Sequence, residues 1–136
     1  MTGRTLTTET TMMIIEAARQ AAQAQGLRAS IAIVDSGANL LGFLRMDGAA
    51  LATIDAACVK ARTAARFEVP TRTFPALNPA LAIPMLAGVN EPLGLFPGGI
   101  PLRAGGQMIG AIGVGGGTSE QDDAAAAAGA ALLAAD

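Results

Sequence analysis

The sequence predicts an α+β domain in which helices cover an antiparallel sheet. The patterns along the chain run in the order helix, β-hairpin, helix, irregular segment, three short β-runs and helix. Consecutive β-runs joined by short turns favour antiparallel pairing, because parallel strands need long crossover connections. A chain of 136 residues is most simply one domain, spanning 1–136, and it is long enough to bury a core without disulfides or metal ions.

The first part of the chain predicts a helix followed by a β-hairpin. Residues 8–25 follow threonines that can cap a helix, and Gly26 is suited to the helix end. The β-runs at 31–34 and 40–46 flank the turn sequence DSGAN. Asp35 is expected to cap that turn, since an aspartate side chain accepts hydrogen bonds from nearby backbone amides.

The middle of the chain predicts a second helix and then irregular structure. Apolar side chains recur at spacings of three and four on one stripe, at Leu51, Ile54, Cys58, Ala61 and Ala65. Arg62 and Arg66 lie one turn apart on another face. Four prolines then interrupt residues 69–90, which favours an irregular segment, and irregular segments of that length are often functional.

The last part predicts three β-runs and a closing helix. The runs are at 94–96, 100–104 and 107–114, and a tight AGGQ turn joins the last two. Ser119 is expected to cap the helix. The acidic residues 122–123 suit its N-terminal turn and are not expected to ligate a metal ion.

Composition excludes several classes of function. The net charge of −2 gives no basic surface for nucleic acid, and no run reaches the roughly 18 apolar residues of a membrane span. The chain has no histidine, tyrosine or tryptophan, which excludes a His-ligated zinc site and a Ser-His-Asp triad. Cys58 is the only cysteine and no signal peptide is evident, so we expect a cytoplasmic protein. With 51% hydrophobic and 15% charged residues, we expect a homodimer or larger homo-oligomer.

The glycine-rich stretch 98–117 does not fit a phosphate-binding loop. A dinucleotide fingerprint that begins at Gly113 needs glycine at its sixth position, which is Thr118 here. A P-loop needs a lysine after its second glycine, and no lysine occurs in or after this stretch. Two interpretations remain. The glycines permit tight turns and close strand packing, or the amides of GGIP at 98–101 form the rim of a pocket that holds a ligand's oxyanion or carboxylate.

Four motifs in a fixed order carry a family resemblance. They are RMDGA, KARTAARFEVPT, GGIPL, and IGAIGVGG followed by EQDD. Together they resemble the GlcG/HbpS family of heme-degrading-domain-like proteins, which is similar to the PduO C-terminal domain. The resemblance implies a profilin-like fold with a five-stranded antiparallel sheet, assembly into homo-oligomers, and binding of heme or related tetrapyrroles. Two features differ from the family: glycine replaces the usual serine in GVGGG, and no histidine is available to ligate iron.

The motifs and the FPGGIP loop at 96–101 supply the candidate ligand-binding residues. They are Arg45, Thr63, Phe67, Phe96, Gly98, Gly99 and Ile100. Arg45 either forms a polar pair with Asp47 at a pocket mouth, where it holds a ligand carboxylate, or forms a structural ion pair. The apolar side chains of Phe67, Phe74, Phe96, Met46 and Met85 either line a cavity or belong to the core.

Three residues are candidates for catalysis if the protein is an enzyme: Glu91, Asp47 and Lys60. Glu91 is the preferred general base, because a carboxylate beside Phe96 and proline rings is expected to have a raised pKa. Lys60 either has a perturbed pKa against the sheet or forms a surface or intersubunit salt bridge.

Three functions remain open. The first is a small-ligand-binding protein of the GlcG/HbpS type, its pocket formed by the RMD junction, the helix of Lys60 and the FPGGIP loop. Its ligand is a tetrapyrrole such as heme or a smaller carboxylated metabolite. The second is a cofactor-independent isomerase, hydratase or lyase in which Glu91 or Asp47 moves a proton. Arg45, Lys60 and the Gly98–Gly99 amides would stabilise an enolate-like charge. The third is a structural assembly domain. The sequence assigns no metal-ligating residue and requires no cofactor, and heme is the one cofactor that the resemblance suggests.

Overall fold

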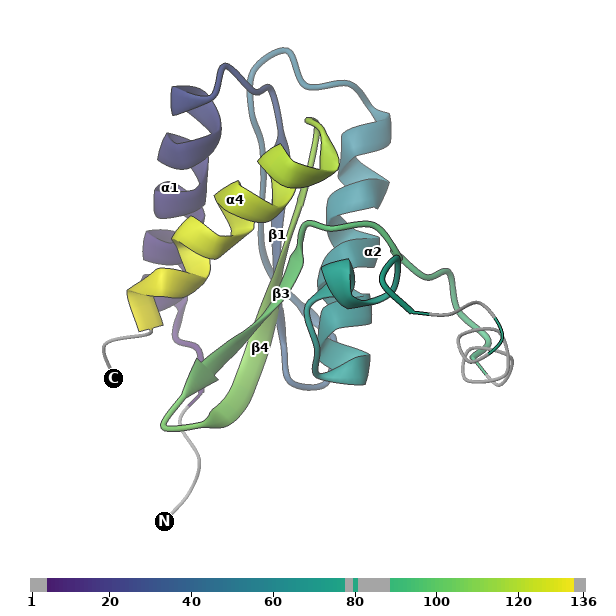
Figure 1. The fold of residues 1–136 in the computed structure, drawn as a ribbon. Helices are drawn as coiled ribbons and strands as arrows, with labels where there is room; N and C mark the ends of the chain where they lie inside the picture. Colours follow the sequence, from purple (N-terminus) through teal and green to yellow (C-terminus); the bar gives the residue numbers. More distant parts are fainter. Residues whose placement is uncertain (1–4, 78–79, 81–88, 134–136) are drawn as a thin grey trace.

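A computed structural model describes residues 5–77, 80 and 89–133 of the chain and has the α+β architecture expected from the sequence (Figure 1). In chain order the elements are α1 (Thr8–Ala24), β1 (Ser30–Asp35), β2 (Leu40–Arg45), α2 (Ala52–Phe67), the 3-10 turn η1 (Thr71–Thr73), β3 (Gly99–Ala104), β4 (Gln107–Gly115), α4 (Ser119–Ala130) and the 3-10 turn η2 (Ala131–Leu133).

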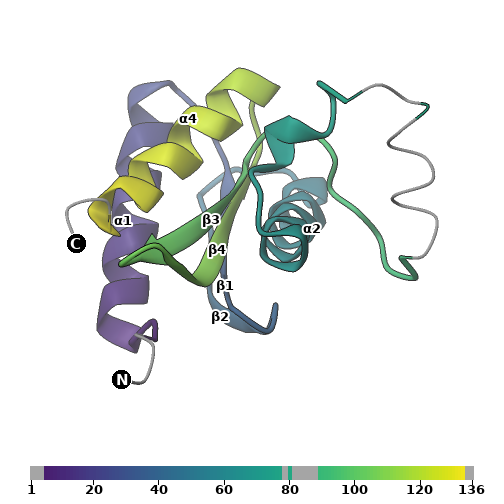
Figure 2. The same ribbon diagram turned by 60° about the horizontal axis from the view of Figure 1, so that its bottom comes forward.

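The sheet has the strand order β2-β1-β4-β3, and every neighbouring pair is antiparallel. At its centre, Ile33 of β1 pairs with Gly42 of β2 on one side and with Ile112 of β4 on the other. Helices α1 and α4 cover one face of the sheet and α2 covers the other (Figures 1 and 2). The fold is therefore three-layered, with β2 and β3 at its two edges.

The expected fifth strand is absent from the described residues, because the apolar run at 94–96 forms no strand. Pro92 and Pro97 bracket this run and have no amide hydrogen to donate to a sheet. Its backbone instead packs on α2, where the Gly94 N–H donates to the hydroxyl of Thr63 at 2.9 Å. The prediction of a five-stranded sheet was wrong, because an apolar run between prolines can equally be packed on a helix.

Helix capping follows the sequence, with one correction. Thr7 caps α1 and accepts a hydrogen bond from the Thr10 N–H, as expected. The cap of α4 is Thr118 and not Ser119, because Thr118 has the extended conformation of a capping residue (φ −69°, ψ 165°). Its hydroxyl accepts from the Gln121 N–H, and the Gln121 side chain accepts from the Thr118 N–H, which completes a capping box.

The glycines of β4 let α2 lie very close to the sheet. The buried layer between α2 and the sheet consists of small side chains, including Ala57, Ala61 and Ala64. A Cβ at Gly113 would overlap the carbonyl oxygen of Ala57, so this approach requires glycine. Gly105 and Gly106, with φ of 58° and 80°, form the tight turn between β3 and β4.

The larger core lies between the sheet and the α1–α4 layer. Ile14 of α1, Ile31 and Ile33 of β1, and Ile112 of β4 are fully buried there. Nowhere in the described part of the chain is a helix both long and apolar enough to cross a membrane.

Candidate functional site: a cleft along helix α2

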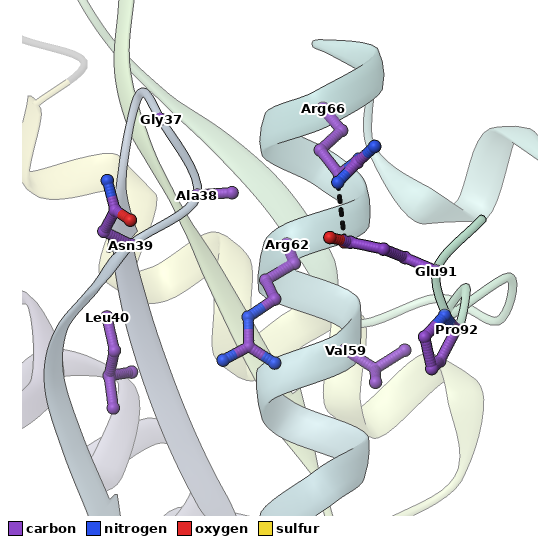
Figure 3. Close-up of a pocket in the computed structure, with 9 residues that line it drawn as sticks. All are labelled: Gly37, Ala38, Asn39, Leu40, Val59, Arg62, Arg66, Glu91 and Pro92. Carbon is purple, nitrogen blue, oxygen red and sulfur yellow. Dashed lines mark ion pairs between the residues drawn. The ribbon is translucent and has the colours of Figure 1, made fainter. Parts of the chain in front are cut away.

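A polar cavity of about 570 Å³ lies between α2, the β1–β2 turn and the segment that follows residue 88 (Figure 3). Its lining residues are Gly37, Ala38, Asn39, Leu40, Val59, Arg62, Arg66, Glu91 and Pro92. Arg62 and Arg66 extend toward it from successive turns of α2. Arg66 Nη1 lies 2.6 Å from Glu91 Oε2, whereas Arg62 forms no ion pair with any described residue. Among the described residues that line it, the cavity therefore has two guanidinium groups and one carboxylate.

The Asp35 carboxylate orders the turn that forms one wall of this cavity. Its Oδ1 accepts hydrogen bonds from the backbone N–H groups of Gly37 at 2.9 Å and Asn39 at 3.0 Å. These bonds, chiefly that from Asn39, lower the pKa of the Asp35 carboxyl below its ordinary value. The expectation that Asp35 caps the turn is confirmed.

An apolar groove of about 480 Å³ continues from the polar cavity along α2. It is lined by Asp55, Ala56, Val59 and Lys60 of α2 and by Pro92, Leu93, Gly94, Leu95 and Phe96. Val59 and Pro92 line both spaces, so the two adjoin. We call the combined space the α2 cleft. It is cationic at the Arg62–Arg66 end and apolar at the other end, where 68% of Phe96 is exposed to solvent.

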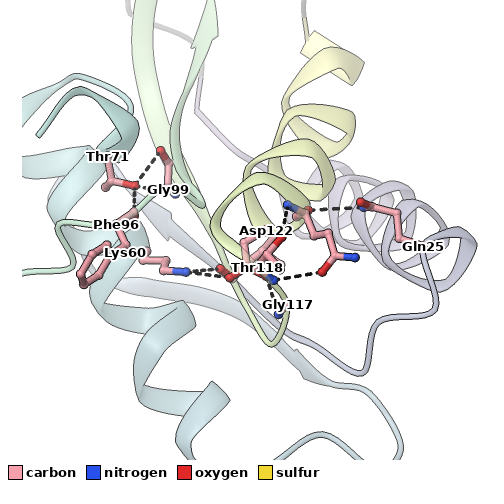
Figure 4. Close-up of polar contacts among 10 residues, drawn as sticks. Gln25, Lys60, Thr71, Phe96, Gly99, Gly117, Thr118 and Asp122 are labelled. Carbon is pink, nitrogen blue, oxygen red and sulfur yellow. Dashed lines mark hydrogen bonds and ion pairs between the residues drawn. The ribbon is translucent and has the colours of Figure 1, made fainter. Parts of the chain in front are cut away.

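Two buried threonines, Thr63 and Thr71, hold the 91–99 segment over α2. Figure 4 shows Thr71 with its partners in this segment. The Thr63 hydroxyl accepts from Gly94 N–H at 2.9 Å and donates to the Val59 carbonyl at 2.8 Å. The Thr71 hydroxyl donates to the Phe96 carbonyl at 2.7 Å and accepts from Gly99 N–H at 2.9 Å. The Gly99 amide, a candidate oxyanion donor from the sequence, is therefore already engaged within the protein.

Lys60 forms a buried ion pair that ties α2 to the start of α4 (Figure 4). Its Nζ lies 2.9 Å from Asp122 Oδ2 and donates to the Val114 carbonyl at 3.0 Å. Its side chain passes directly beside Gly98, where a Cβ would lie only 3.0 Å from Nζ. Asp122 also accepts from the Gly117 N–H at 2.8 Å. The ammonium group is thus held by a carboxylate and a carbonyl of the same chain.

Arg45 and Asp47 lie in a different place from Lys60 and Glu91. They line a smaller cavity of about 340 Å³, together with Leu44 and Met46 and with Arg19 and Gln23 of α1. The structure brings Lys60, Phe96, Gly98 and Gly99 together near α2, and it does not bring Arg45 and Asp47 to them.

The remaining apolar candidates that the structure describes pack against other parts of the protein. The rings of Phe67 and Phe74 meet edge to face, with centroids 5.3 Å apart and planes at 78°. Ile100 and Met46 pack against the larger core. Met85 lies outside the described residues. Phe96 is thus the one phenylalanine among these candidates that lines the α2 cleft.

Sequence reasoning did not select the two arginines of the cleft or Thr71. The spacing of Arg62 and Arg66 was a usable signal, because residues four apart share one helix face. The β1–β2 turn and Glu91 both lie close to these arginines in the fold, but no local pattern in the sequence indicates that they do. No cluster of three or more potential metal ligands occurs among the described residues.

The chain matches proteins of known family over most of its length. The model of the family described as haem degrading protein HbpS-like matches residues 6–131. Protein GlcG of Escherichia coli is 34% identical over 106 residues, covering 74% of this chain and 74% of GlcG.

Two solved structures share the fold at moderate identity. A Streptomyces reticuli HbpS variant superposes with a TM-score of 0.86 at 34% identity, covering 98% of this chain and 90% of that one. A structure described as a PduOC:heme complex superposes with a TM-score of 0.88 at 26% identity, covering 96% of each chain. The resemblance noted in the sequence is confirmed, and the chain belongs to the HbpS-like family.

Proposed function

We propose that the α2 cleft binds a planar amphipathic molecule with carboxylate groups, and that this ligand is a tetrapyrrole such as heme. One observation carries the proposal: the guanidinium groups of Arg62 and Arg66 line a cavity that continues, past Val59 and Pro92, into an apolar groove. Ligand sites in proteins typically combine such an apolar wall with a few polar groups that fix orientation.

The chemistry of a tetrapyrrole matches the two ends of the cleft. Its macrocycle would pack against the apolar end near Leu95 and Phe96, and its carboxylates would pair with the arginines, whose planar groups bind carboxylates through two hydrogen bonds. The relative solved as a heme complex supports this choice over a smaller carboxylated metabolite, which would leave the apolar groove unfilled.

The described residues of the cleft match the macrocycle and the carboxylates of a tetrapyrrole, and they offer no histidine or thiolate ligand to a heme iron. The chain has no histidine, and Lys60 in the cleft is paired with Asp122. Cys58 on α2 is half-buried, and burial raises the pKa of its thiol, which disfavours the thiolate that would bind iron. We therefore expect metal-free protoporphyrin IX to bind about as well as hemin.

The test is a spectroscopic titration of the purified protein with protoporphyrin IX and with hemin. Replacing both arginines in Arg62→Ala/Arg66→Ala is expected to raise the dissociation constant at least about tenfold, because two charge-assisted contacts are lost. Arg45→Ala removes an arginine from the smaller cavity, and we expect it to change the dissociation constant by less than about twofold. Equal weakening by both variants, or unchanged binding by the double variant, would contradict the assignment.

The structure gives less support to proton-transfer catalysis. Glu91 and Asp47 line different cavities, and Glu91 is paired with Arg66. The expected self-association is supported by large apolar side chains that are exposed in the single chain outside the α2 cleft, namely Met12, Met13, Leu41 and Leu51. Self-association is compatible with ligand binding, and we do not propose it as the function in place of ligand binding.

A further inference from the structure

The cationic end of the α2 cleft already contains a carboxylate from the protein itself. Glu91 Oε2 lies 2.6 Å from Arg66 Nη1, and the two side chains are 50% and 39% exposed. An ion pair with this much exposure contributes little stability, so it can open at small cost. Arg62, one helical turn away, forms no ion pair with a described residue and lines the same cavity.

We propose that Glu91 is a specificity-determining residue of the cleft, because its carboxylate occupies Arg66 in place of a ligand carboxylate. This inference rests on the proposed function. With Glu91 in place, one guanidinium that lines the cleft, that of Arg62, forms no ion pair with a described residue. A first ligand carboxylate binds Arg62, and a second reaches Arg66 only by displacing Glu91.

The consequence is a dependence on the number of carboxylates in the ligand. A tetrapyrrole with one carboxylate uses Arg62 and leaves the Glu91–Arg66 pair intact. A tetrapyrrole with two carboxylates must replace the Glu91–Arg66 ion pair by an ion pair of its own with Arg66. Part of the free energy gained from its second carboxylate is therefore lost to the displacement of Glu91. Removing the Glu91 charge therefore strengthens binding of the dicarboxylate more than that of the monocarboxylate.

The experiment compares Glu91→Gln with wild type, using protoporphyrin IX as the dicarboxylate and pyropheophorbide a as the monocarboxylate. We expect Glu91→Gln to tighten protoporphyrin IX about threefold and to change pyropheophorbide a by less than about 1.5-fold, in line with the small energy of an exposed ion pair. In an Arg66→Ala protein, Glu91 has no Arg66 to occupy, so Glu91→Gln is expected to change the affinities for the two ligands by the same factor.

Glu16→Gln is the matched control. Glu16 is paired with Arg19, which lines the smaller cavity, so this variant makes the same change in net charge and frees an arginine outside the α2 cleft. It should leave both affinities unchanged.

The outcomes separate the two proposals. If binding requires Arg62 but Glu91→Gln weakens protoporphyrin IX or tightens both ligands equally, the role of Glu91 is wrong and the cleft assignment stands. If wild type binds neither ligand, or if Arg62→Ala has no effect, both proposals fall.

Discussion

Replacing Lys60 with methionine is expected to lower the free energy of unfolding by about 3–5 kcal/mol. The side chains of Lys60 and Asp122 are only 11% and 4% exposed, and the Lys60 ammonium is the cationic partner of the Asp122 carboxylate. Methionine keeps most of the apolar stem but leaves Asp122 buried without a cation. The loss of that partner, rather than the net strength of the pair, accounts for the size of the effect.

Urea denaturation followed by far-ultraviolet circular dichroism measures this change without tryptophan or tyrosine, which the chain lacks. The matched control is Arg72→Met, which removes the cation of the Arg72–Asp123 pair. Arg72 is 52% exposed, so its loss is expected to cost at most about 1 kcal/mol. If Lys60→Met costs no more than Arg72→Met, Lys60 is not the structural tie between α2 and α4.

Replacing Gly113 with alanine is expected to cost at least about 3 kcal/mol, the upper part of the range for overpacked cores. The added Cβ would overlap the carbonyl oxygen of Ala57 and the amide nitrogen of Ala61. Both are backbone atoms of α2 and cannot turn aside as a flexible side chain can. The helix would have to move away from β4, opening the small-residue layer beneath it.

The control for this substitution is Gly105→Asn in the β3–β4 turn. Nothing lies within 4 Å of a Cβ built at Gly105, and asparagine tolerates its φ of 58° better than most residues do. We expect a change within about 0.5 kcal/mol in the same urea experiment. A Gly113→Ala protein as stable as wild type would show that α2 does not pack on β4 as closely as described.

Local signals in the sequence account for most of the elements. Thr7, the turn glycines and the spacing of small residues on α2 act through capping, backbone conformation and helix periodicity, each of which depends on near neighbours. The 94–96 run was misassigned because its partner is Thr63, which lies about thirty residues earlier in the chain. Short apolar runs have the same appearance whether they enter a sheet or pack on a helix.

The candidate site was predictable only in part. Sequence reasoning selected Lys60, Glu91 and Phe96, all of which line the α2 cleft, but it grouped them with Arg45 and Asp47. Arg45 and Asp47 are separated from the α2 cleft by the tertiary structure, because Arg45 is the last residue of β2 and shares its cavity with residues of α1. The burial of Lys60 depends on Asp122, which comes from the far end of the chain.

Amide hydrogen exchange with and without protoporphyrin IX tests the location of the ligand site most directly, because it needs no substitution and applies to any oligomeric state. Binding in the α2 cleft predicts slower exchange in the walls at 36–40 and 89–97 and no change at 45–50, beside the smaller cavity. Slower exchange confined to 45–50 would place the ligand against Arg45 and Asp47 and contradict the assignment of the α2 cleft.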